Sequence, residues 1–183
     1  MIDLGGKAIL IMATHGFEES ELTGPRELLS RAGATVKIAA PSMDPIQARV
    51  HDEPTIKVDP DMTIDEVDID DFDALILPGG VINPDSLRRD EKAVALVRRF
   101  DAAGKVVAAI CHGPWMLVEA DVLRGRRATS WPSIRTDMRN AGAELVDEAA
   151  CVDGRMVTSR QPEDVPAFCD AISRLLCGDE KSR

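Results

Sequence analysis

The sequence predicts a single α/β domain built around a mostly parallel β-sheet, and three observations lead to this fold class. Short continuous apolar runs, such as residues 74–77 and 106–110, have the length and composition of strands buried on both faces. Longer amphipathic segments with helical periodicity alternate with these runs. A chain of 183 residues with 44% hydrophobic residues is also long enough to form one full core.

The first third of the chain contains a strand–helix–strand unit. Its helix begins in an acidic segment, which the positive end of the helix dipole favours, and ends at a glycine. Such a unit implies two parallel strands joined by a right-handed crossover. We expect a strand over 7–13, a helix from 18–21 to Gly33, a second strand over 35–40 and, in the proline-rich excursion 41–60, an edge strand over 55–58.

The middle of the chain begins with an acidic stretch, residues 63–73, which we interpret as a solvated turn and not as a cation site. A calcium loop would need alternating ligands around a central glycine, and this stretch contains no glycine. We expect a strand over 74–77, a loop over 81–88, a helix over 91–103 and a strand over 106–110.

The last third of the chain alternates shorter elements, and Asp153-Gly154 predicts a tight hairpin turn between two of them. No linker or internal repeat divides the sequence, so we expect one domain over residues 1–183, with tails at 1–6 and 178–183. The expected elements are helices over 115–120, 134–141 and 165–176, and strands over 126–129, 144–146, 150–152 and 156–159.

Charge and composition exclude several function classes. The net charge of −10 argues against a nucleic acid or an anionic membrane as partner, because both require a basic surface. Residues 1–6 lack the features of a signal peptide, so we expect a cytoplasmic protein with reduced thiols. The four cysteines and three histidines lack zinc-ligand spacing, and the fingerprints of dinucleotide and nucleotide triphosphate sites are absent. We therefore expect neither a metal nor a cofactor.

The strand over 106–110 leads into a helix through a turn of only about three residues, with Cys111 at its apex. Small residues, Ala109 and Gly113, flank this cysteine, as in a nucleophile elbow. A thiol at a helix N-terminus is favoured as thiolate, and the adjacent His112 is a candidate proton carrier. The alternative is a buried cysteine that only packs, which is common for free cysteines.

Ligands of an open α/β sheet collect beyond the C-terminal ends of its strands, and three loops of this chain lie there. Glu18 follows the first strand, and it is either a carboxyl group that shares a proton with Cys111 or only a helix-start acid. Gly79 and Gly80 follow the third strand. They are either a simple turn or a close backbone approach in which the N–H groups of Gly80 and His112 stabilise an oxyanion.

Several motifs resemble those of the ThiJ/PfpI superfamily, in particular its branch of PfpI-type intracellular proteases. The similarity extends from about Lys7 to about Leu176 and implies a flavodoxin-like three-layer α/β/α sandwich, related to class I glutamine amidotransferases. The motifs are AICHGPW at 109–115, LPGG at 77–80, FEESE at 17–21, TSWPSI at 129–134, NAGA at 140–143 and a VDG and VTSR pair within 152–160.

The resemblance assigns Cys111 the role of nucleophile, Glu18 that of its carboxyl partner and His112 that of proton carrier. In PfpI-type proteins a third acid comes from a neighbouring subunit, and the matching position here is Asp85, where the archaeal pattern has Glu. The alternative for Asp85 is a plain turn and helix start. The resemblance therefore implies a homodimer or a higher homo-oligomer with a shared site.

Members of this superfamily are described as peptidases, as glyoxalases or deglycases, and as stress proteins whose elbow cysteine is oxidised. This chain supplies a thiolate, oxyanion donors and a proton carrier, which favours a cysteine-dependent enzyme acting on small carbonyl compounds or peptides. The alternative is a non-catalytic oxidative-stress protein, either a redox sensor or a chaperone-like protein.

Overall fold

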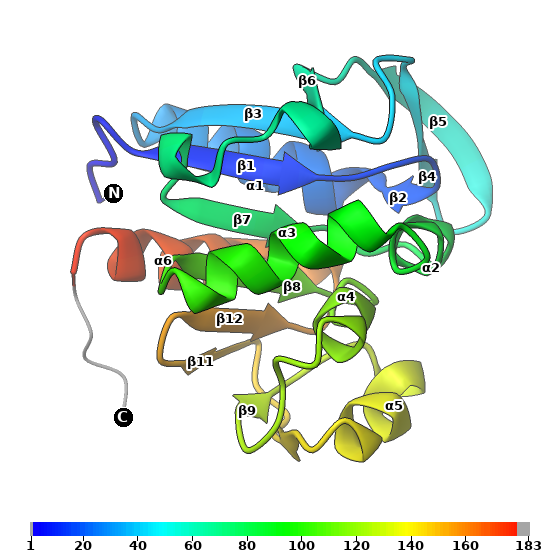
Figure 1. Ribbon diagram of the computed structural model, residues 1–183, viewed down its shortest axis with the longest axis vertical. Helices are drawn as coiled ribbons and strands as arrows, with labels where there is room; N and C mark the ends of the chain where they lie inside the picture. Colours follow the sequence, from blue (N-terminus) through cyan, green and yellow to red (C-terminus); the bar gives the residue numbers. More distant parts are fainter. Residues whose placement is uncertain (1, 179–183) are drawn as a thin grey trace.

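A seven-stranded sheet runs through the centre of the protein, with its strands in the order β11-β12-β8-β7-β1-β3-β6 (Figure 1). This computed structural model describes residues 2–178. Only β11 is antiparallel to its neighbour, so the predicted mostly parallel sheet is confirmed. The strands are β1 (Ala8–Met12), β3 (Thr35–Ala40), β6 (Met62–Thr63), β7 (Ala74–Leu77), β8 (Val106–Ile110), β11 (Ala150–Asp153) and β12 (Met156–Ser159).

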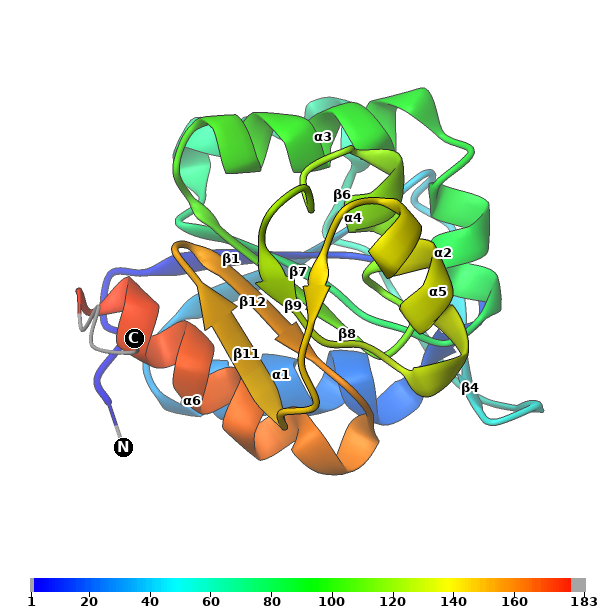
Figure 2. The ribbon, with the colours of Figure 1, turned by 90° about the horizontal axis from the view of Figure 1, so that it is seen from below.

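Helices cover both faces of the sheet and complete the expected flavodoxin-like three-layer sandwich (Figure 2). Helices α1 (Glu19–Arg31) and α6 (Val165–Leu176) pack side by side on one face, and α3 (Glu91–Ala102) packs on the other. The remaining helices are α2 (Ile82–Leu87), α4 (Trp115–Glu119), α5 (Arg135–Asn140) and four 3-10 turns, η1 (Ile64–Glu66), η2 (Ile69–Asp71), η3 (Pro132–Ile134) and η4 (Pro162–Asp164).

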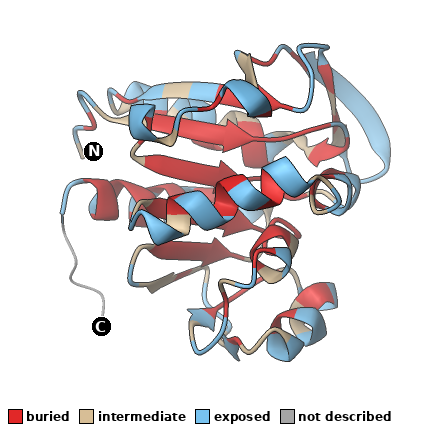
Figure 3. Ribbon diagram, viewed as in Figure 1, coloured by how far each residue is buried: buried red, intermediate tan, exposed pale blue. Residues whose placement is uncertain are grey.

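The strands are buried on both sides, and Figure 3 shows the central sheet as the most deeply buried layer. Along β1 the side chains alternate between the two halves of the core. Ile9 and Ile11 pack on the side of α1 and α6, whereas Leu10 and Met12 pack on the side of α3. This two-sided burial explains why the central strands have continuous apolar sequences and not alternating ones.

Residues 41–60 form more than the expected edge strand. They fold into an antiparallel hairpin of β4 (Ile46–Val50) and β5 (Glu53–Val58), which pairs with β2 (Phe17–Glu18) in a separate three-stranded sheet. A second small sheet pairs β9 (Arg127–Ala128) with β10 (Glu144–Leu145). The first strand of the β4–β5 hairpin has no continuous apolar run because β4 alternates buried Ile46 and Ala48 with more exposed residues, and β5 is exposed except at Val58.

Two further expectations were wrong. We expected a loop over 81–88, but residues 82–87 of this stretch form helix α2, in which Asn83, Pro84 and Leu87 are buried. The segment 1–6 is not a simple tail, because Leu4 is fully buried in the core and its N–H donates to the carbonyl of Ala32. Of the expected C-terminal tail, residues 179–183 lie outside the described residues. No helix within residues 2–178 is long and apolar enough to cross a membrane.

Replacing Leu4 with alanine tests the burial of this N-terminal segment. Loss of a fully buried leucine side chain should lower the free energy of unfolding by about 2–5 kcal/mol, measured by denaturant titration. The matched control is Ile56→Ala, at an exposed position of β5 with 44% of its surface accessible. That change should cost no more than about 0.5 kcal/mol. Equal, small losses in the two variants would show that residues 2–6 do not contribute to the core.

Candidate active site

Cys111 occupies the turn between β8 and α4 in a left-handed backbone conformation, with φ of 62°. This conformation costs an L-residue about 1–2 kcal/mol, so surrounding contacts must hold it. Its N–H donates to the carbonyl of Ser159 over 3.1 Å, and its own carbonyl accepts from the N–H of Trp131 over 3.0 Å. At Gly113, a Cβ atom would lie 2.3 Å from the carbonyl oxygen of Leu77, so only glycine fits there. The predicted elbow therefore has its expected strand–turn–helix geometry.

The sulfur of Cys111 lies at the C-terminal edge of the sheet, and only 6% of the residue is exposed. The backbone N–H groups of His112 and Gly80 lie beside this sulfur and counteract the rise in the pKa of the thiol. They are the two groups expected to act as oxyanion donors. Gly79 makes their approach possible, because a Cβ at Gly79 would lie 2.7 Å from Cβ of Cys111 and 2.9 Å from the His112 nitrogen.

The carboxyl group beside Cys111 belongs to Glu21, in the first turn of α1. Glu21 is fully buried, and its Oε2 accepts the N–H of Gly79 over 2.8 Å. Its Oε1 has no hydrogen-bond partner among residues 2–178, and the carboxyl group lies close enough to the Cys111 thiol for each group to shift the pKa of the other. Burial raises the pKa of Glu21 to about 8, so this carboxyl group carries a proton at neutral pH.

The Cys111 thiol and the Glu21 carboxyl group titrate as a coupled pair. Burial, followed by the negative charge of an ionised Glu21, raises the pKa of Cys111. A protonated Glu21 has the opposite effect, because it can donate a hydrogen bond to a thiolate. The proton on Glu21 therefore decides whether its neighbour becomes nucleophilic.

Glu18 was expected at this place, and the structure corrects that assignment. Glu18 ends β2 and is half-buried, and its Oε2 accepts the N–H of His51 over 3.4 Å. The phase of α1 decides between the acids of the FEESE motif. Glu21 shares a helix face with Pro25 and Leu29, which lie four and eight residues further and are both buried. That spacing was visible in the sequence and is the signal that would have identified Glu21.

His112 lies between the thiol and a hydroxyl group. Its Nδ1 is 3.3 Å from Sγ of Cys111, and its Nε2 is 3.1 Å from Oγ of Ser133. Burial lowers the pKa of His112, so the imidazole is neutral at neutral pH. The indole rings of Trp115 and Trp131 pack against it, with centroids 5.4 and 5.9 Å away. A neutral ring that donates from Nε2 to Ser133 presents a free Nδ1 acceptor to the thiol. Sequence reasoning gave Ser133 no role.

Asp85 lies in the first turn of α2 and is exposed. The polar contacts of the His112 ring within the described chain are those with Cys111 and Ser133, so Asp85 does not orient this histidine from the same subunit. Its expected role across a subunit contact stays a prediction. Among residues 2–178, no group of three or more His, Cys, Asp or Glu side chains is arranged to hold a metal ion.

The other cysteines differ from Cys111 in their surroundings. Burial raises the pKa of Cys151 to about 11 and that of Cys169 to about 12. Cys177 is exposed, near the end of the described chain. Of the four thiols, only that of Cys111 is surrounded by a carboxyl group, an imidazole and two backbone N–H groups.

The sequence matches the DJ-1/PfpI family over residues 7–175. The chain belongs to this family. It is 44% identical to deglycase PfpI of Pyrococcus furiosus over 168 aligned residues, and this alignment covers 92% of this chain and 98% of the relative. It is 43% identical over 171 residues to protein/nucleic acid deglycase 2 of Escherichia coli, which covers 93% of this chain and 98% of the relative.

A solved structure gives the same result for the fold. DJ-1beta of Drosophila melanogaster superposes with a TM-score of 0.86 at 30% sequence identity, over 96% of this chain and 92% of that one. The expected ThiJ/PfpI relationship is therefore confirmed. The DJ-1/PfpI fold places the elbow of this chain at the C-terminal sheet edge, where α/β proteins bind ligands.

Glu21→Gln tests the coupling of Glu21 to Cys111 in this DJ-1/PfpI protein. The amide keeps the shape of the side chain but removes the titrating proton and the negative charge above pH 8. The pH profile of Cys111 alkylation should therefore lose one of its two steps. The rates are read by peptide mass mapping in a Cys177→Ser background, which removes the exposed competing thiol. Glu18→Gln is the matched control and should keep both steps. The coupling is refuted if Glu21→Gln has the profile of the parent protein.

Proposed function

We propose that this DJ-1/PfpI protein is a cysteine-dependent enzyme that converts reactive carbonyl compounds, as a glyoxalase or deglycase. One observation carries the proposal: the sulfur of Cys111 lies among a protonated carboxyl group, a neutral imidazole and two backbone N–H groups. These are the groups that thiol addition to a carbonyl requires. The names of the two curated relatives support the same class of reaction.

The first chemical step is addition of the thiol to an aldehyde. Nδ1 of His112 takes the thiol proton, the C–S bond forms, and the C=O π electrons move to oxygen. The N–H groups of Gly80 and His112 stabilise the resulting oxyanion, which then takes a proton from Glu21.

The later steps need no external oxidant when the substrate is a dicarbonyl. Transfer of the C–H proton to the adjacent carbon converts the hemithioacetal into a thioester and reduces the neighbouring ketone to an alcohol. Water then hydrolyses the thioester and frees the thiol, so that dicarbonyl plus water gives a 2-hydroxy acid. After the first step His112 carries the former thiol proton and Glu21 is ionised, so the Glu21 carboxylate accepts the C–H proton and returns it to the adjacent carbon, and protonated His112 supplies the proton that the later steps need.

Burial of the thiol favours small substrates. With 6% of Cys111 exposed and its sulfur 3.3 Å from Nδ1 of His112, a free aldehyde reaches the sulfur more easily than the backbone of a folded protein does. Free thiols at all four cysteines of the described chain fit a reducing compartment, and we propose a cytoplasmic location.

Turnover of methylglyoxal, compared with that of a peptide panel, tests this function. Wild-type protein should convert methylglyoxal to lactate, and Cys111→Ala should lose at least about a thousandfold of this activity. Peptides should be cleaved far more slowly. Normal turnover by Cys111→Ala would refute the thiol mechanism. Peroxide oxidation of Cys111 in a protein that turns over neither substrate would favour the redox-sensor alternative.

We further propose that a homodimer completes the site, with Asp85 of each subunit close to His112 of the other. Asp85 is exposed, and the neighbouring Val81 and Ile82 have 55% and 46% of their surfaces accessible, which suits a face covered by a second copy. An isologous contact would give each site the loop of the other subunit. A carboxylate there would help to fix the imidazole tautomer.

Mixing of inactive variants tests the shared site. Asp85→Asn should lower turnover about tenfold or more while the dimer persists in sedimentation. Asp85→Asn subunits mixed with Cys111→Ala subunits should regain activity, because one site of each mixed dimer then holds wild-type groups from both chains. A fully active monomer at micromolar concentration would contradict the shared site, as would no recovery despite demonstrated subunit exchange.

A further inference from the structure

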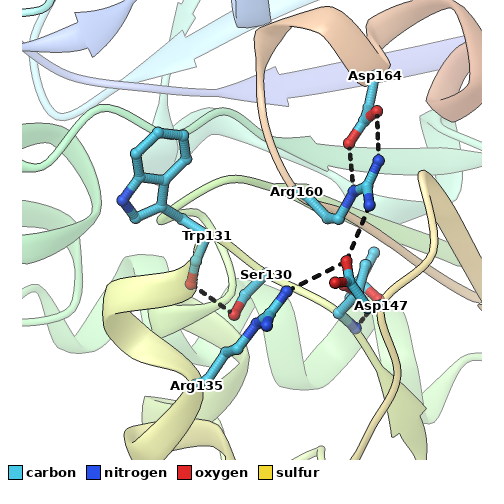
Figure 4. Close-up of polar contacts among 8 residues, drawn as sticks. Ser130, Trp131, Arg135, Asp147, Arg160 and Asp164 are labelled. Carbon is cyan, nitrogen blue, oxygen red and sulfur yellow. Dashed lines mark hydrogen bonds and ion pairs between the residues drawn. The ribbon is translucent and has the colours of Figure 1, made fainter.

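Four charged side chains form a continuous chain of ion pairs beside the elbow (Figure 4). The guanidinium group of Arg160 makes two hydrogen bonds to Asp164, of 2.8 and 3.1 Å, and a third to Asp147, of 2.8 Å. Asp147 also pairs with Arg135 at 3.2 Å. We call these four residues the Arg160 network. Its members come from three segments that are separate in the sequence: the connection between β12 and α6, which holds both Arg160 and Asp164, the loop before β11, and the start of α5.

The two arginines of the Arg160 network each adjoin a segment that holds the elbow. Arg160 directly follows Ser159, whose carbonyl binds the N–H of Cys111. Arg135 directly follows the turn η3, which is flanked by Trp131 and contains Ser133. The N–H of Trp131 binds the carbonyl of Cys111, and the hydroxyl group of Ser133 binds Nε2 of His112. The network thus links the segments that fix both polar backbone groups of Cys111 and the ring of His112.

We infer that the Arg160 network positions the reactive pair, because it holds the Ser159 and Trp131–Ser133 segments at the separation that the left-handed cysteine requires. Arg160 and Asp147 are positioning residues, since they touch neither the thiol nor the imidazole. The inference concerns the reactivity of Cys111 and rests on the proposed function only where turnover is measured.

The Arg160 network is built strongly enough to hold these segments in place. Isolated surface ion pairs contribute little to stability, but Arg160 binds two carboxylates. Its Nε and Nη2 donate to Asp164, and its Nη1 donates to Asp147. The side chain of Asp164 is only 8% exposed, and that of Arg160 is 27% exposed. Hydrogen bonds to Arg160 lower the pKa of Asp147, and both carboxylates raise the pKa of Arg160. Asp147 links the two arginines, so its loss would separate the two segments without burying a charge.

Asp147→Asn tests the inference, because the side chain of Asp147 is 63% exposed and its replacement should leave the protein folded. Misplacement of His112 relative to the thiol should slow Cys111 alkylation at pH 7 about tenfold and move the midpoint of its pH profile upward. These measurements use the Cys177→Ser background. In turnover of methylglyoxal, kcat should fall with little change in KM. Asp147→Glu keeps the charge and should recover part of the alkylation rate.

Asp101→Asn is the matched control, because Asp101 forms a similar two-bond ion pair with Arg126, of 2.7 and 3.1 Å, that does not adjoin the elbow. It should leave the alkylation rate and its pH midpoint unchanged, whatever it does to the thermal midpoint. The inference is overturned if Asp147→Asn alkylates as fast as the parent, or faster, or if Asp101→Asn slows alkylation equally. Because alkylation needs no substrate, slow alkylation by Asp147→Asn in a protein without turnover would disprove the proposed function and leave the positioning role standing.

Discussion

The left-handed conformation of Cys111 is the constraint on which the rest of the site depends. A strand must become a helix within about three residues, and an L-residue at the apex pays a steric cost for this turn. The cost is offset by backbone hydrogen bonds from β12 and from the segment before α5, which reach Cys111 from opposite sides. The buried carboxyl group of Glu21 and the imidazole of His112 both lie next to the Cys111 side chain, so the conformation of Cys111 determines how these groups meet.

Burial sets the protonation states of both Glu21 and His112. Glu21 keeps its proton because it is buried, whereas His112 stays unprotonated for the same reason, so burial gives one acid and one base near neutral pH. Neither residue needs a charged partner in the same subunit. Within the described chain, the hydroxyl group of Ser133 contacts Nε2 of the ring, and the N–H of Gly79 donates to the carboxyl group.

Much of the fold was predictable, because strands buried on both faces leave continuous apolar runs. The runs at 74–77 and 106–110 match β7 and β8 residue for residue. The same principle explains the failures. Strand β5 is exposed except at its last residue and therefore has no apolar run, and Leu4 is a single fully buried residue in a segment too short to show a periodic pattern. The tight turn predicts the position of Cys111, but the acid beside it is Glu21, three residues after the predicted Glu18. The FEESE motif contains three acids within one helical turn. Only the phase of the helix, set by the buried positions further along α1, identifies the acid that faces the core.

The glycines around the thiol have a consequence for how this protein can diverge. Gly79 and Gly113 take part through the absence of a side chain, and the oxyanion donors are main-chain N–H groups that every residue but proline possesses. The groups that would stabilise the oxyanion therefore belong to the main chain and do not depend on the identity of a side chain. The side chains that surround these groups come from other parts of the chain: Trp115, Trp131 and Ser133 against His112, and Asn83 of α2 against the carbonyl of Gly79. Substitutions among those surrounding side chains can adapt the site to a new carbonyl compound while the reaction centre stays unchanged. Substrate specificity can therefore evolve independently of the catalytic chemistry in this fold.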